Sequence, residues 1–134
     1  AIIAILAAIA IPAYNNYIKE ARMAKVTDHY DTAIRGLKGE MAKRAATIAR
    51  TGDPTSVAVL DFTEIRNIID PDNRPAPNGA AAYVETATPS NTTGEIGITT
   101  DGAAGTVGAE TIVVYRPDYL ELAPGSTRIE ATNL

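Results

Sequence analysis

The stretch AIIAILAAIAIPAYNNYIKEAR, residues 1–22, decides the fold of this chain. Residues 1–13 are almost entirely Ala, Ile and Leu, and no charged side chain occurs before Lys19. A helix that is apolar on all sides must be buried in lipid or in other protein. The rest of the chain offers too little apolar surface to surround it, which argues against the alternative of a buried core helix. A bilayer span needs about 20 residues, so we expect the sequence to begin inside a longer apolar segment.

From Tyr14 onward the pattern changes to that of an amphipathic helix. Apolar side chains recur at steps of three and four along residues 14–50, which predicts one face packed on a partner surface. These positions are Tyr14, Tyr17, Ile18, Ala21, Met23, Val26, Tyr30, Ala33, Ile34, Leu37, Met41, Ala45 and Ile48. Gly52 and Pro54 predict the end of the helix. Pro12 lies where the pattern changes, and because it donates no backbone hydrogen bond we expect a kink or loosening there.

The second half of the chain predicts a small β-rich head. Asp61 and Glu64 have the spacing of a capping box, which predicts a short helix over residues 62–69. Strands are expected at residues 82–86, 95–100, 111–116 and 127–131, arranged as an antiparallel sheet on the amphipathic helix. Leu120, Leu122 and Pro124 are expected to seal an edge of this sheet. The predicted class is α+β, in four parts: an apolar segment (1–13), an amphipathic helix (14–50), a connection with a short helix (51–81) and a sheet head (82–134).

The composition limits the chemistry that the chain can perform. There is no Cys, only one His, and a net charge of −4. Residues 19–50 hold eight Lys or Arg against four Asp or Glu, whereas residues 51–134 hold four against twelve. The basic residues lie on one helix among acidic ones, which is a poor pattern for nucleic-acid binding. No catalytic motif is found, so we expect no enzyme and no cofactor, and we place His29 on the surface.

A few residues have a possible binding or modification role. Asp70, Asp72 and Asn73 could offer oxygens to a calcium ion, although Asp-Pro-Asp-Asn is favoured as a simple turn. Asn91 begins an Asn-Thr-Thr acceptor pattern for glycosylation. Tyr14, Tyr17 and Tyr30 lie near one another along the helix, and packing at a subunit interface explains them better than an aromatic electron path.

Residues 1–22 closely resemble the N-terminal helix of type IV pilins and the related pseudopilins, in which a proline is followed closely by a tyrosine. The resemblance is one of pattern over residues 23–50, and no motif is recognised beyond residue 51. It implies a long helix under a C-terminal antiparallel sheet. The family's processed N-terminus is not in this chain and is expected upstream of Ala1. The family often has glycine near Ala4 and a C-terminal disulfide, and this chain has neither.

The resemblance implies a structural subunit of a type IV pilus, with adhesion, motility or DNA uptake as possible roles. The implied partners are further copies of the chain, the bacterial inner membrane before assembly and the pilus assembly machinery; the filament itself would be extracellular. The open alternatives are a pseudopilin of a type II secretion system and a membrane-tethered binding protein. The expected assembly residues are Ile2, Ile3, Ile5, Leu6, Ile9, Ile11, Pro12, Tyr14 and Tyr17.

Overall fold

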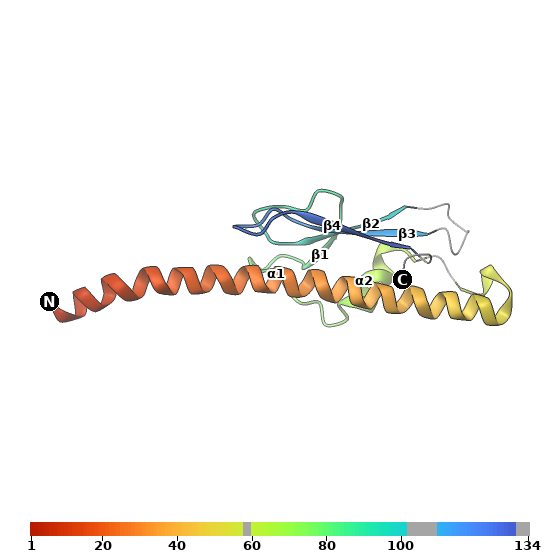
Figure 1. Cartoon of the computed structure of the whole chain (residues 1–134), viewed down its shortest axis with the longest axis horizontal. Helices are drawn as coiled ribbons and strands as arrows, with labels where there is room; N and C mark the ends of the chain where they lie inside the picture. The colour runs from red at the N-terminus through yellow and green to blue at the C-terminus, as the bar shows by residue number, and fades with distance from the viewer. Residues whose placement is uncertain (58–59, 102–109, 131–134) are drawn as a thin grey trace.

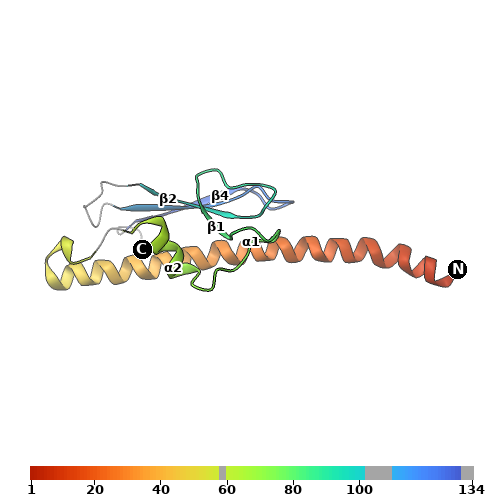
Figure 2. The same ribbon diagram turned by 180° about the vertical axis from the view of Figure 1, so that it is seen from behind.

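The computed structural model describes residues 1–57, 60–101 and 110–130, and it places a small sheet on one long helix (Figure 1). The elements are α1 (Ile2–Thr51), the short 3-10 helix η1 (Pro54–Ser56), α2 (Phe62–Ile69), β1 (Tyr83–Glu85), β2 (Ile96–Asp101), β3 (Thr111–Arg116) and β4 (Gly125–Glu130). We call α2, the sheet and their connections the head. The head lies against the C-terminal part of α1, and the N-terminal part projects beyond it in both views (Figure 2). The predicted α+β class is confirmed.

Helix α1 is continuous through Pro12, so the loosening expected there is not found in this structure. Proline fixes φ near its helical value, and gentle curvature accommodates both the missing backbone donor and the crowding of its ring against the preceding turn (Figure 1). The C-terminal end follows the prediction. Gly52 adopts the left-handed conformation with φ 68°, and its N–H donates to the carbonyl of Ile48 at 2.7 Å.

Helix α2 begins and ends where the sequence predicts. The Asp61 carboxylate accepts a hydrogen bond from the backbone N–H of Glu64 at 2.8 Å. The Glu64 carboxylate in turn accepts one from the backbone N–H of Asp61 at 3.3 Å. This reciprocal capping satisfies donors that would otherwise lack a partner at the start of the helix.

The sheet is mixed, which corrects the expectation of an antiparallel meander. Strands follow the order β1-β2-β3-β4; β2–β3 and β3–β4 are antiparallel, whereas β1 and β2 run parallel. The turns between residues 86 and 95 return the chain so that β2 starts beside the start of β1. Strand β4 covers Gly125–Glu130, so it begins two residues earlier than expected, and only position 131 of the predicted span lies outside the described residues.

The core lies between one face of the sheet and one stripe of α1. The helix contributes Val26, Ala33 and Leu37, each completely buried. The sheet and α2 cover them with fully or almost fully buried side chains, namely Ile65, Ile96, Ile98, Ile112, Val114 and Ile129. Each aliphatic side chain of this size contributes about 1.5–3 kcal/mol when it is buried. This stripe therefore holds the head on the helix.

Gly97 of β2 packs closely against the backbone of the segment that follows β1. A methyl group there would lie 2.3 Å from the carbonyl oxygen of Thr86, whereas one at Gly39 on α1 would meet nothing within 4 Å. We expect Gly97→Ala to lower the free energy of unfolding by about 1–3 kcal/mol, because backbone must move to admit the methyl group. The matched control, Gly39→Ala, should raise it by up to about 1 kcal/mol.

Chemical unfolding of both full-length variants in mild detergent, followed by circular dichroism, measures the difference. If Gly97→Ala is as stable as Gly39→Ala, the close packing of β2 against residue 86 is wrong.

Candidate functional site

The N-terminal part of α1 has no cover within the described chain. The large apolar side chains there are between 60% and 83% exposed: Ile2, Ile3, Ile5, Leu6, Ile9, Ile11, Tyr14 and Tyr17. Contact with the head begins at Ile18, which is partly covered. The uncovered segment, residues 1–17, is called the stem below, and it extends beyond the boundary predicted at residue 13. All of the expected assembly residues, Pro12 included, lie on it and are exposed.

The stem is apolar enough to enter a membrane. A window of 18 residues in α1 has a mean hydropathy of 1.4, and none of it is buried within the chain. By length and composition α1 could therefore cross a bilayer. Burial of six large stem side chains, from Ile2 to Ile11, would contribute roughly 9–18 kcal/mol before the costs of ordering. Lipid or other protein chains are the two environments that supply such burial.

A groove marks the junction between stem and head. It is lined by Tyr14, Asn15, Ile18, Lys19, Arg22 and Leu120. Across it, Lys19 forms an ion pair with Glu121, and this hydrogen bond lowers the pKa of the Glu121 carboxyl. Leu122 packs against the core as predicted, but Leu120 is 46% exposed. The expectation that Leu120 seals the sheet is therefore wrong: its side chain faces the junction groove instead.

The calcium candidates form a turn held by an arginine. Asp70 is buried, and its Oδ1 accepts hydrogen bonds from the backbone N–H of Arg74 at 3.0 Å and from Arg74 Nε at 3.2 Å. Asn73 adopts φ 58°, and Asp72 is exposed. Within residues 1–57, 60–101 and 110–130, no three or more His, Cys, Asp or Glu side chains gather as metal ligands. The arrangement explains the Asp-Pro-Asp-Asn segment as a turn.

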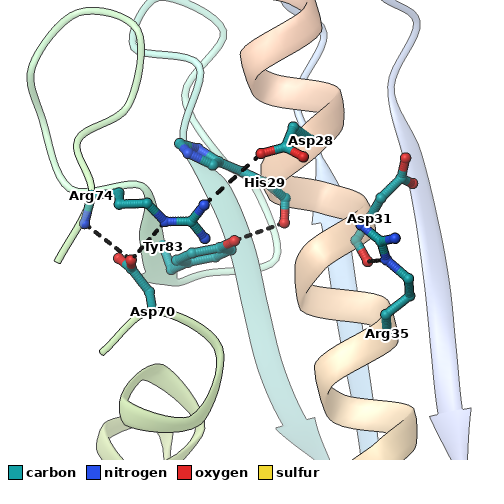
Figure 3. Close-up of polar contacts among 7 residues, drawn as sticks. All are labelled: Asp28, His29, Asp31, Arg35, Asp70, Arg74 and Tyr83. Atoms are coloured by element: carbon teal, nitrogen blue, oxygen red, sulfur yellow. Dashed lines mark hydrogen bonds and ion pairs between the residues drawn. The ribbon is translucent and has the colours of Figure 1, made fainter. Parts of the chain in front are cut away.

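His29 is buried in the interface between α1 and the head, so its predicted surface position is wrong. Only 2% of the residue is exposed, and its ring lies 5.8 Å from the ring of Tyr83 between centroids (Figure 3). The Tyr83 hydroxyl donates to the backbone carbonyl of His29 at 2.7 Å. Position 29 follows Val26 by three residues and precedes Ala33 by four. That helical spacing was the signal that could have placed it on the buried face.

Arg74 closes this cluster from the side of the 70–82 connection. Its guanidinium contacts Asp70 and also lies 3.9 Å from Asp28 of α1 (Figure 3). Burial lowers the pKa of His29, and the nearby positive charges of Arg74 and Lys25 lower it further. The hydrogen bond with Asp70 raises the pKa of Arg74. Both effects favour the neutral form of His29 beside the charged guanidinium of Arg74.

A second feature that sequence reasoning missed is an ion pair at the other end of the head. Arg44 of α1 lies 3.6 Å from Glu110, just before β3, and both side chains are only 9% exposed. The excess of basic residues on the helix and of acidic residues in the head was visible in the sequence. Some of these opposite charges pair within one chain, as the ion pairs Arg44–Glu110 and Lys19–Glu121 between α1 and the head show.

Tyr30 does not share the surroundings of the stem tyrosines. It is 9% exposed, its hydroxyl lies 2.6 Å from Thr127 Oγ1, and the guanidinium of Arg116 stands 5.5 Å above its ring. Tyr30 therefore packs within one chain, between α1 and the head, in contrast to the subunit-interface role expected for it. Asn91 is exposed in a turn, where a glycosylation acceptor would be accessible.

The chain was compared with family models, curated proteins and solved structures. No family model, curated protein or solved structure matches it. The uncovered stem and its junction with the head are the features of the chain that bear on its function.

Removal of the stem should leave a folded head. We expect a chain that begins at Lys19 to be soluble, monomeric and cooperatively folded, because residues 1–17 supply nothing to the core. Light scattering with size-exclusion chromatography measures its mass, and circular dichroism its sheet content and melting. Aggregation, or the loss of the sheet signal, would show that the stem belongs to the core.

Acidification should weaken the attachment of the head through His29. The pKa of His29 is lowered from 6.5 on folding, so the unfolded chain takes up the proton first. The free energy of unfolding should therefore fall as the pH drops from about 6.5 toward the lower pKa of the folded chain. Chemical unfolding at several pH values measures this slope. His29→Gln should be nearly flat over the same interval, and an unchanged slope in that variant would contradict the assignment.

Proposed function

We propose that this chain is the structural subunit of a helical filament of the type IV pilus kind, which polymerises through its stem. The observation that carries the proposal is the stem itself, whose large apolar side chains are at least 60% exposed. Such a surface is not stable in water on its own. Further copies of the chain supply its cover in the filament, and lipid supplies it before assembly.

The shape of the subunit favours an open polymer. A stem that packs on different surfaces of successive copies makes a heterologous contact, and such contacts produce a helical filament when the rotation does not close. The heads then form an outer layer around a core of stems. This arrangement agrees with the implied partners, namely other copies, the inner membrane and an assembly machinery, and with an extracellular filament.

Burial of the stem should dominate the energy of assembly. An exposed ion pair contributes about 0–1 kcal/mol, well below the total for the stem side chains. Lys19 and Arg44 already pair within their own chain, which leaves fewer basic residues for contacts between subunits. Charges between copies therefore set register and rate of approach more than strength.

A charge in the stem should abolish assembly. A charge reversal at an exposed position on the half of α1 that carries the head should not. We expect Ile5→Lys to form no filaments, because each copy would bury an unpaired charge at a cost of several kcal/mol. Lys38→Glu, on an exposed part of α1, should assemble more slowly or with altered helical geometry. Electron microscopy of fibre yield and length at equal expression measures both.

The same micrographs separate the alternatives. Long fibres support a pilus, short fibres a secretion pseudopilus, and their absence in the unmodified protein a membrane-tethered binding protein. Normal assembly of Ile5→Lys together with failure of Lys38→Glu would invert the proposed order of forces.

A further inference from the structure

The junction groove is built from two different kinds of wall. One is apolar: Tyr14 and Ile18 of α1 line it together with Leu120, which comes from the turn between β3 and β4. Leu120 is held there at φ 55°, a conformation that residues other than glycine seldom adopt. Backbone hydrogen bonds between Tyr119 and Leu122 on either side, at 2.9 and 3.2 Å, fix this turn. The head thus presents an exposed leucine at the level where the stem emerges.

The other wall is cationic. Lys19 and Arg22 line the groove, and Glu121 engages Lys19. Within the described part of the chain, Arg22 forms no ion pair or side-chain hydrogen bond with another residue. Tyr14, Ile18 and Arg22 are spaced by four residues and so lie on one face of the helix. The planar guanidinium of arginine binds phosphate oxygens in pairs, which makes it well suited to an anionic headgroup.

The position of the groove selects its partner. The groove follows directly on the stem, which carries no charged side chain and is apolar enough to lie in hydrocarbon. Exposed Tyr14 and Tyr17 stand at its end, and tyrosines are enriched where hydrocarbon meets headgroups. Arg22 follows one turn beyond Ile18, so with the stem in a bilayer it would lie on the headgroup side of these tyrosines.

We propose that this groove binds the headgroup of an anionic phospholipid, with Arg22 on the phosphate and with Tyr14, Ile18 and Leu120 against the first carbons of the acyl chains. The inference rests on the membrane stage of the proposed function. Leu120 and Arg22 then hold the head against the bilayer surface at a fixed depth. A free phosphate ion would use the arginine but leave the apolar wall without a contact.

The test measures which lipid the full chain retains. The protein is purified in mild detergent, exposed to equal amounts of phosphatidylglycerol and phosphatidylcholine, and the lipid that stays bound is counted by native mass spectrometry. We expect the anionic lipid to be preferred, and Arg22→Gln to lower that preference about fivefold, the effect of one basic residue near an anionic surface. Arg35→Gln is the matched control, since Arg35 is an exposed α1 arginine whose hydrogen bond within the described residues goes to its own helix, at the carbonyl of Asp31 (Figure 3).

Two further arms make the result decisive. Leu120→Ser should reduce the amount of either lipid retained, and millimolar inorganic phosphate should not displace the bound lipid. Equal losses from Arg22→Gln and Arg35→Gln, or displacement by inorganic phosphate, would overturn the headgroup site while leaving filament assembly untouched. If the unmodified chain retains no lipid and does not insert into phosphatidylglycerol vesicles, the membrane stage of the proposed function fails as well.

Discussion

The packing of one stripe of α1 against the sheet is the contact on which the rest of the structure depends. Val26, Ala33 and Leu37 are completely buried in it, and the buried side chains of α2 and the sheet pack in the same cluster. The helix has 50 residues, about 75 Å, whereas the longest strands have six residues, about 20 Å. A head of this size covers only part of such a helix. The exposed stem is thus a consequence of the proportions of the chain, and it directs the molecule toward lipid or other copies.

Most of the fold could be predicted because its signals are local. The boundaries of α2 depend on Asp61 and Glu64, whose capping hydrogen bonds join residues three apart. Gly52 ends α1 because the left-handed conformation costs glycine little. The apolar segment was recognised from its composition alone. These features need no knowledge of which distant residues meet, and for the same reason the exposed position of the predicted assembly residues could be anticipated.

Apart from the loosening expected at Pro12, the errors concern contacts between residues that are distant in sequence. His29 was placed on the surface because its neighbours Asp28 and Asp31 are charged, yet the ring of Tyr83 covers it. The parallel pairing of β1 and β2 depends on how the turns after residue 86 return the chain, which strand periodicity does not encode. Leu120 was assigned to a sheet edge because it is apolar, whereas its backbone conformation turns it toward the stem. In each case the outcome depends on a part of the chain far from the residues that carried the prediction.

The stem and the junction groove are used in both proposed stages, namely in the membrane before assembly and among other copies in the filament. The two uses exclude each other. Tyr14 and Ile18 line the groove, and Tyr14 is also among the side chains expected to pack on neighbouring copies in a filament. One face of a helix cannot contact acyl chains and another protein chain at the same time. Departure from the membrane would therefore release the lipid, and the burial of the stem among other copies has to exceed what lipid provided. A site that holds one headgroup through a single arginine suits that requirement, because it fixes the depth of the head without making extraction prohibitive.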